Sequence, residues 1–232
     1  MPLVLFAGQS NALGFGNNDP APYTPTWRVQ IWTGEAFNYM DPGRNTGTPA
    51  NPAAWGPEVG FARDWLAANP TGILYLGKVA KGETGLAPSA GLDWSPASQG
   101  EMFDRAAGVA AAMRANLGVA TLDAVFWMQG EQDATDAGAA SAYGDRLTAF
   151  LGAVRADWMG DAGGYVGAGR IGDSDALPFN LDVRVAQWQV DQVDDHLETF
   201  RTLDFEMQAD GLHYAADGHL AIGHRFFDAW AT

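Results

Sequence analysis

The chain has 232 residues, of which 47% are hydrophobic and 18% are charged, a balance that is typical of a globular protein. Its formal net charge is −15, and its 13 lysine and arginine residues are not clustered along the sequence. This charge repels phosphate backbones and anionic lipid surfaces, so we expect neither a nucleic acid nor a membrane as a partner. Cysteine is absent, which excludes disulfides, thiolate metal sites and a cysteine nucleophile.

The N-terminal segment is short and apolar. Residues 1–7 lack basic residues and are too short for a signal peptide or a membrane span, so they indicate the first core strand. No internal repeat or low-complexity tract divides the sequence. We therefore expect a single domain over residues 1–232, whose oligomeric state the sequence does not indicate.

Hydrophobic patterns predict strands and helices that alternate along the chain. In order, they are a strand at 3–7, a strand at 27–32, a helix at 58–69, a strand at 73–80, a helix at 102–117, a strand at 122–128, a helix at 139–158, a strand at 165–171, a helix at 183–193, a strand at 197–203 and a helix at 217–230. Residues 183–193 also fit a strand, although the helical spacing is favoured. Residues 14–26 and 41–57 are rich in turn-forming residues and are predicted loops. This alternation favours an α/β fold, a three-layer α/β/α sandwich with a mostly parallel, flavodoxin-like sheet.

Three polar segments directly follow predicted strands. Ser10 follows the first strand, the turn at residues 82–85 follows the strand at 73–80, and Gln129 follows the strand at 122–128. Active sites of parallel sheets lie beyond the carboxyl ends of the strands. We therefore expect these three segments on one rim of the sheet.

Ser10, Asp210 and His213 could form a nucleophilic site. A serine hydroxyl is a weak nucleophile at neutral pH, so it needs an imidazole to take its proton and a carboxylate to orient that imidazole. Asp210 and His213 are three residues apart, so within one turn both can point to the same side.

Each of these residues has an alternative interpretation. Ser10 or Asn11 could simply cap a helix, which is a common role of serine and asparagine after a strand. His213 could be a surface residue before the last helix. His219 and His224 are competing bases, but neither has a carboxylate three residues before it.

Further polar residues follow the strand at 122–128. The side-chain amide of Gln129 could donate to an oxyanion, or it could satisfy backbone groups at the strand end. Glu131 and Asp133 could form a carboxylate pair for acid–base or metal chemistry. No histidine lies at ligand spacing from them, so we expect no metal.

Other motifs restrict the classes of ligand. The turn at residues 82–85 is too short for a phosphate-binding loop, and no dinucleotide fingerprint follows the first strand. Kinase, NTPase and dehydrogenase functions are therefore disfavoured. Trp55, Trp94 and Trp127 could stack on sugar faces, but core packing is the favoured interpretation of a large aromatic residue.

Taken in order, these motifs resemble the SGNH hydrolase superfamily and, within it, the sialate O-acetylesterase and acetylxylan esterase branch, the sixth carbohydrate esterase family. The matching segments lie within residues 3–225 and are Gly8-Gln9-Ser10-Asn11, Trp55-Gly56-Pro57-Glu58 with Phe61 and Ala62, Gly82-Glu83-Thr84 followed by Trp94, Trp127-Met128-Gln129-Gly130-Glu131 with Asp133, and Asp210-Gly211-Leu212-His213 with Gly218. Their joint order is more specific than any single motif. The resemblance implies the SGNH hydrolase fold and a serine esterase that hydrolyses O-acetyl esters on carbohydrates, such as acetylated polysaccharides or sialic acids.

The resemblance also implies roles for individual residues. In the triad, Ser10 is the nucleophile, His213 is the general base and then the acid, and Asp210 orients the imidazole. The other implied residues hold the oxyanion or support the site: the N–H groups of Ser10 and Gly82 and the side chain of Gln129 for the oxyanion, and Gln9 and Glu131 for support. The implied partner is an acetylated carbohydrate, and no metal or organic cofactor is needed.

One position departs from the family pattern. Glu83 takes the place of the second glycine in the family's Gly-Gly-Thr turn, where a side chain could crowd the oxyanion hole or set a carboxylate beside the developing negative charge. This favours, as an alternative, a non-catalytic or weakly catalytic carbohydrate-binding protein on the esterase fold, as in surface or phage-type fibre attachment. A lipase or thioesterase of the same superfamily is a third interpretation, which the lack of a contiguous aliphatic lid disfavours.

Overall fold

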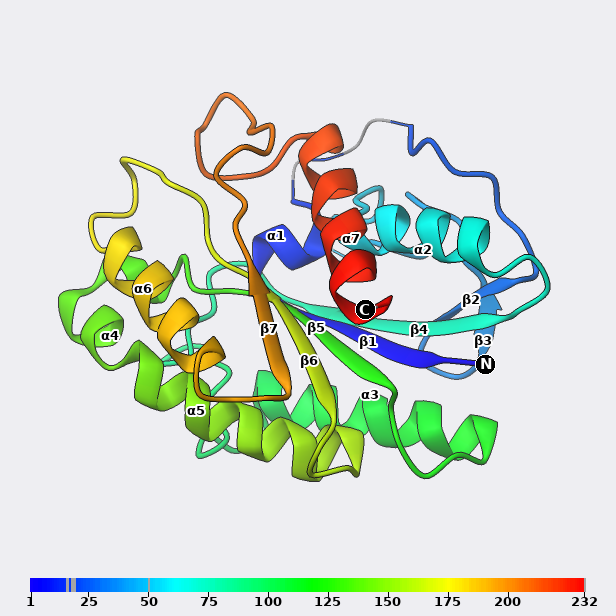
Figure 1. Ribbon diagram of the computed structural model, residues 1–232, viewed down its shortest axis with the longest axis horizontal. Helices are drawn as coiled ribbons and strands as arrows, with labels where there is room; N and C mark the ends of the chain where they lie inside the picture. Colours follow the sequence, from blue (N-terminus) through cyan, green and yellow to red (C-terminus); the bar gives the residue numbers. More distant parts are fainter. Residues whose placement is uncertain (16, 18–19, 50, 232) are drawn as a thin grey trace.

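A seven-stranded sheet with the strand order β3-β2-β4-β1-β5-β6-β7 lies at the centre of the structure (Figure 1). The computed structural model describes residues 1–15, 17, 20–49 and 51–231. The strands are β1 (Leu3–Gly8), β2 (Val29–Trp32), β3 (Phe37–Tyr39), β4 (Leu74–Ala80), β5 (Ala124–Met128), β6 (Tyr165–Gly169) and β7 (Leu197–Phe200). Neighbouring strands pair in parallel, except for β2 and β3, which are antiparallel.

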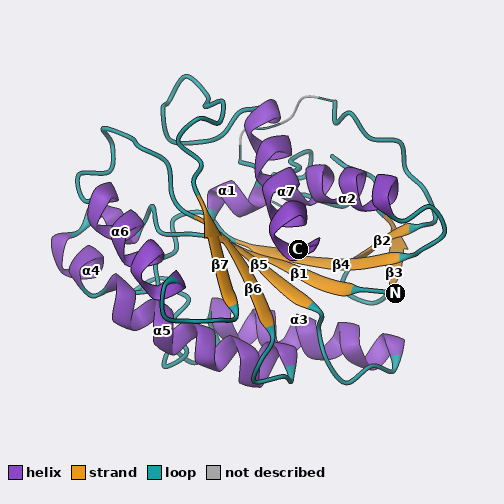
Figure 2. Ribbon diagram, viewed as in Figure 1, coloured by secondary structure: helices purple, strands orange, loops and turns teal. Residues whose placement is uncertain are grey.

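Helices cover both faces of this sheet, as Figure 2 shows. One face carries α1 (Ser10–Leu13), α2 (Pro57–Ala68) and α7 (Ala216–Ala231). The other face carries α3 (Met102–Leu117), α4 (Ala137–Ser141), α5 (Tyr143–Ala153), the π-helix η2 (Val154–Met159) and α6 (Asn180–Asp191), with the 3₁₀ turn η1 (Asp133–Thr135) before α4. This arrangement confirms the predicted three-layer α/β/α sandwich. In the described part of the chain, no helix has the length and apolar character needed to cross a membrane.

The central strands are buried on both faces. Every residue of β1 and β5 is buried, because each strand has a parallel neighbour on either side and a helical layer above and below. Strands in such a position read as continuous apolar runs and do not alternate between apolar and polar residues. This explains why the short run at the N-terminus is a reliable signal for the first core strand.

The elements predicted at residues 102–117 and 183–193 are helices in the structure, α3 and α6. The single helix predicted at 139–158 is instead divided into α4, α5 and η2. A side-chain cap marks the first of these pieces, since Asp136 accepts a hydrogen bond from the backbone N–H of Ala139. Three short elements, α1, β3 and η1, were not predicted, because three or four residues are too few to show a hydrophobic period.

Helices α2 and α7 pack closely through glycine. A Cβ atom at Gly223 of α7 would overlap the carbonyl oxygen of Pro57 and the backbone nitrogen of Phe61, and a Cβ atom at Gly60 of α2 would overlap the carbonyl oxygen of Leu220. The absence of a side chain at these two positions lets the helix backbones approach each other. Since α7 begins three residues after His213, this packing also helps to fix the end of the loop that carries the histidine.

Substitution of Gly223 tests this packing. We expect Gly223→Ala to lower the free energy of unfolding by about 1–3 kcal/mol, because the added methyl group forces the two helices apart. Gly108 of α3 is the matched control: a Cβ atom there meets no atom within 4 Å, so Gly108→Ala should leave stability unchanged or raise it by about 0.5–1 kcal/mol. Urea unfolding measures both variants, and equal effects at the two positions would contradict the close packing.

Candidate active site

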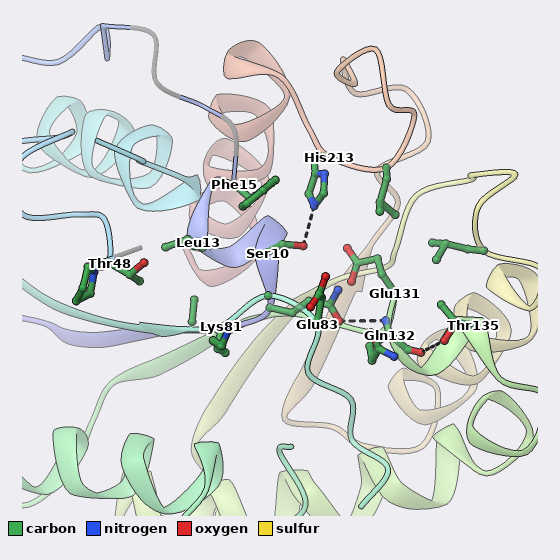
Figure 3. A pocket seen from close by; sticks show the side chains of 16 residues that line it. Ser10, Leu13, Phe15, Thr48, Lys81, Glu83, Glu131, Gln132, Thr135 and His213 are labelled. Carbon is green, nitrogen blue, oxygen red and sulfur yellow. Dashed lines mark hydrogen bonds between the residues drawn. The ribbon is translucent and has the colours of Figure 1, made fainter. Parts of the chain in front are cut away.

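Ser10 opens onto a cavity of about 520 Å³ at the carboxyl ends of the central strands (Figure 3). It is the first residue of α1, and Gly8 of β1 lies two residues before it. Gly82 follows β4 and Glu131 follows β5, and both also line this cavity. The parallel order β4-β1-β5 therefore brings the segments after these three strands to one rim.

The structure joins Ser10, His213 and Asp210 in a series of hydrogen bonds. The Oγ atom of Ser10 lies 3.1 Å from Nε2 of His213, and Nδ1 of the same ring lies 2.7 Å from Oδ2 of Asp210. Since a carboxylate accepts and cannot donate, Nδ1 carries the proton and Nε2 is left to accept from the serine hydroxyl. This is the arrangement that activates a serine.

Local backbone geometry holds Asp210 in place. Its Oδ1 atom accepts hydrogen bonds from the backbone N–H groups of Leu212 and His213, at 2.9 and 3.0 Å. Partial burial acts to raise the pKa of the Asp210 carboxyl, but the hydrogen bonds from His213 and Leu212 outweigh it and hold the pKa below its usual value. Asp210 therefore stays ionised at neutral pH and can stabilise a positive imidazole.

Asn11 links α1 to the loop that carries Asp210 and His213. Its Nδ2 atom donates to Oε1 of Glu131 at 2.6 Å and to the carbonyl oxygen of Leu212 at 3.2 Å, while its Oδ1 atom accepts from the backbone N–H of Tyr214 at 3.2 Å. Neither Ser10 nor Asn11 caps α1 with its side chain, so the capping interpretation does not apply to this helix. No sequence motif indicated this role of Asn11.

Gln129 does not reach the cavity. Its side chain is fully buried, and its Nε2 atom lies 2.6 Å from Oδ2 of Asp133 and 3.1 Å from the carbonyl oxygen of Thr84. Asp133 and Thr84 therefore accept both hydrogens of the Gln129 amide. The Oε1 atom of Gln129 accepts from the hydroxyl of Tyr143. The prediction that Gln129 donates to an oxyanion does not agree with this arrangement, because its donors face the protein interior.

Backbone N–H groups remain as candidate oxyanion donors. A Cβ atom built at Gly82 would lie 3.6 Å from the Cβ atom of Ser10, so the two residues are adjacent. Among the described residues, no hydrogen-bond acceptor faces the backbone N–H of Ser10 or of Gly82. The turn that carries Gly82 is fixed by Thr84, whose hydroxyl donates to the carbonyl oxygen of Lys81 and accepts from Nε1 of Trp94.

Gln9 and Glu131, the two expected supporting residues, border the cavity. The Oε1 atom of Gln9 accepts from the backbone N–H of Gln132 at 3.2 Å, which fixes the loop after β5. Glu131 is buried, and its Oε2 atom has no partner among the described residues. Burial raises the pKa of the Glu131 carboxyl, and the hydrogen bond from Asn11 and the charge of His213 oppose this only in part.

Other candidates have structural roles. Asp133 accepts hydrogen bonds from the backbone N–H groups of Leu86 and Ala87, so it holds a loop and does not form an acid–base pair with Glu131. Trp55, Trp94 and Trp127 are 1%, 0% and 1% exposed, so they pack in the core and none is free to stack on a sugar. In the described residues, no group of three histidine, aspartate or glutamate side chains could hold a metal ion.

The competing histidines are placed away from Ser10. His219 is fully buried, and burial, together with the positive charge of Lys78, lowers its pKa to about 3. His224 lies at the surface, where its ring nitrogens contact Asp64 at 2.6 Å and Asp228 at 3.3 Å. Of these histidines, only His213 contacts the Ser10 hydroxyl.

Phe15 lines the cavity, although it was not among the predicted site residues. Its ring centroid lies 4.7 Å from that of His213, and its side chain remains 42% exposed. An aromatic residue in the loop just after α1 was the signal available in the sequence. Phe15 therefore limits the rotation of the imidazole and forms an apolar wall beside Ser10 (Figure 3).

Glu83 has a left-handed backbone conformation with φ 61°, the one positive φ of a non-glycine residue in the described chain. This conformation explains why a glycine would suit the position, since a side chain there costs about 1–2 kcal/mol. Glu83 lines the cavity and is exposed, so its carboxylate faces solvent next to Gly82.

Substitution of Glu83 should reveal this strain. We expect Glu83→Gly to raise the free energy of unfolding by about 0.5–1 kcal/mol, the relief of strain being offset in part by the greater freedom of glycine in the unfolded chain. Glu83→Ala is the control, because it removes the carboxylate but keeps the Cβ atom, and it should bring no gain. Equal gains in urea unfolding would assign the effect to charge and contradict strain.

The raised pKa of Glu131 predicts a pH-dependent penalty on folding. The folded protein binds this proton more tightly than the unfolded chain, so ionised Glu131 disfavours folding above the ordinary pKa of a glutamate and not below it. We expect Glu131→Gln to raise the free energy of unfolding near pH 7, with the gain shrinking toward about pH 4. Glu35→Gln, at an exposed position, is the control. A gain that does not change with pH would contradict this account.

Comparisons with known proteins place the chain in a family. The family model described as "Carbohydrate esterase, sialic acid-specific acetylesterase" matches residues 1–232. A search of curated proteins gave no significant match.

Several solved structures share the fold. A protein from Arabidopsis thaliana is 18% identical, with a TM-score of 0.84 over 99% of this chain and 97% of its own. NanS is 13% identical, with a TM-score of 0.74 over 99% and 96% of the two chains. Est24, a carbohydrate acetylesterase from Sinorhizobium meliloti, is 14% identical, with a TM-score of 0.59 over 100% and 99%. Since the family model covers the whole chain, the protein belongs to the sialic acid-specific acetylesterase family of carbohydrate esterases, with the SGNH hydrolase fold.

Proposed function

We propose that the protein is a serine esterase that removes O-acetyl groups from carbohydrates. The observation that supports this most is the hydrogen-bonded series of Ser10, His213 and Asp210, which opens onto a cavity. Membership of the carbohydrate esterase family gives the reaction class. The triad supplies each group that ester cleavage by a serine needs.

In the first half of the reaction, the Ser10 hydroxyl attacks the acetyl carbonyl carbon while its proton passes to Nε2 of His213. The imidazole becomes positive, and ionised Asp210 stabilises it through the 2.7 Å contact at Nδ1. The carbonyl oxygen becomes an oxyanion that accepts from the backbone N–H groups of Ser10 and Gly82. His213 then gives its proton to the sugar oxygen as the ester bond breaks.

In the second half, water releases the acetyl group. His213 takes a proton from this water, which attacks the acetyl-serine carbonyl at the same oxyanion position. Collapse of the intermediate breaks the bond to Oγ, His213 returns its proton to Ser10, and acetic acid leaves and ionises to acetate. We assign Gln129 a supporting part, because its amide holds the carbonyl oxygen of Thr84 and so helps to position the turn of Gly82.

The cavity lining suits an acetylated sugar. Leu13, Phe15 and Leu212 provide apolar walls, while Thr48 and Gln132 provide polar groups. Carbohydrates present both apolar ring faces and hydroxyl groups, so such a mixed lining can contact the sugar around the ester.

One observation favours the alternative function, a carbohydrate-binding protein without esterase activity. Glu83 sets an exposed carboxylate beside Gly82, where negative charge develops in the proposed reaction. Like charges repel, so this carboxylate opposes the oxyanion. Binding of a glycan without release of acetate would support this alternative.

Hydrolysis of p-nitrophenyl acetate tests the proposal. We expect Ser10→Ala to lower kcat by about 10³-fold or more, since the nucleophile is lost, and Asp210→Asn to lower it by about 10²- to 10⁴-fold, since the imidazole loses its orienting carboxylate. Ser141→Ala, at an exposed position on α4, is the control and should keep full activity. Release of acetate from acetylated xylan, acetylated sialic acid and acetylated bacterial polysaccharides then identifies the sugar. Undiminished activity of folded Ser10→Ala would refute the proposed mechanism.

A further inference from the structure

Four arginines gather at the rim of the sheet beyond the proposed active site. Arg170 follows β6 and Arg201 follows β7, and the parallel register that pairs Gly169 with Phe200 sets the two arginines side by side. Arg184 lies on α6 and Arg225 on α7, and both line cavities that Arg170 and Arg201 share. In a chain with a net charge of −15, this concentration of positive charge stands apart.

These guanidinium groups have unused donors. Among the described residues, the side chains of Arg170, Arg201 and Arg225 form no hydrogen bond or ion pair, and Arg184 approaches only Asp173, at 3.7 Å. The buried Nε of Arg170 and the buried Nη1 of Arg184 have no acceptor. Arg155 offers a contrast, because it binds Asp194 through two hydrogen bonds of 2.8 and 2.9 Å.

The arginines share their cavity with apolar side chains, most of which are exposed. Arg170, Arg184 and Arg201 line a cavity of about 230 Å³. The apolar residues that also line it are Ile171, Leu181, Val185, Trp188 and Leu203. Trp188 is 46% exposed, whereas Trp55, Trp94 and Trp127 are buried. A half-exposed indole can pack against a ring, and the neighbouring guanidinium groups can bind an acidic group on that ring.

The surrounding carboxylates limit the charge of the ligand. Asp173 lies near Arg184, Asp191 acts on Arg170, and Asp204 lines the adjoining cavity. Four guanidinium groups against these three carboxylates leave an excess of one positive charge. The balance favours a group with a single negative charge, such as a carboxylate, over a doubly charged phosphate.

We propose that the arginine-lined cavity between α6 and the ends of β6 and β7 binds a sugar unit that carries a carboxylate. The guanidinium groups of Arg170 and Arg201 hold the carboxylate, and Trp188 packs against the sugar ring. The assignment of the ring to a sugar rests on the proposed function. Because β7 is the third strand along from β1, the cavity lies roughly 14 Å along the rim from Ser10. One acidic polysaccharide can therefore contact both places.

Titration calorimetry with glucuronate tests this site. Glucuronate carries no ester, so its binding is independent of hydrolysis and the result stands whether or not the esterase test succeeds. We expect glucuronate to bind, glucose to bind at least tenfold more weakly, and inorganic phosphate to bind more weakly than glucuronate. Arg201→Ala and Trp188→Ala should each weaken glucuronate binding about tenfold, whereas Arg105→Ala, at an exposed position on α3, should not change it.

Three results would overturn the proposal. If glucose bound as tightly as glucuronate, the arginines would not recognise the carboxylate. Binding of phosphate as tight as that of glucuronate, unaffected by Trp188→Ala, would show a simple anion site. A dimer that Trp188→Ala dissociates, together with no glucuronate binding, would show that this surface joins two copies of the chain. Both variants should keep their rate on p-nitrophenyl acetate, because neither residue lines the cavity of Ser10.

Discussion

The hydrogen bonds of the Asn11 side chain hold together segments that are far apart in sequence. Asn11 binds Glu131, which is 120 residues away, and the backbone of Leu212 and Tyr214, which are 201 and 203 residues away. The sheet places β1 and β5 side by side, but it does not place the loop of His213. The Asn11 amide therefore helps to set the position of the imidazole over Ser10, together with Gln208, whose side chain donates to the carbonyl oxygen of Phe15.

Buried polar groups behind the cavity support the same geometry. The Nζ atom of Lys78 donates to the carbonyl oxygen of Leu13, at the end of α1, and to Glu58 at 2.8 Å. Both side chains of this ion pair are almost fully buried, so loss of either partner would leave an uncompensated charge. In the same way, Tyr143 and Gln187 bind the backbone oxygen of Gln129 and fix the end of β5. The cavity thus has a rigid floor, although its walls are loops.

The sequence predicts the scaffold better than it predicts the side-chain contacts. Buried parallel strands carry continuous apolar runs, so β1 and β5 were readable, and strand ends then located Ser10 and Gly82. Short elements such as α1 and β3 show no period, and the break between α4 and α5 lies within a continuous apolar pattern. The burial of Gln129 could not be read, because the choice between a cavity and Asp133 depends on a side-chain torsion that no spacing encodes.

The chain order of the site bears on its synthesis. All seven strands are present once Phe200 has been made, whereas Asp210 and His213 come later, directly before α7. A domain generally folds as a unit, and α7 supplies part of the core that covers one face of this sheet. Ser10 is made 203 residues before its imidazole partner, and the proposed triad therefore forms only when the segment before α7 has docked. A chain that stops after Phe200 would lack Ile222 and Phe226, which cover one face of the sheet from α7, as well as the imidazole that contacts Ser10.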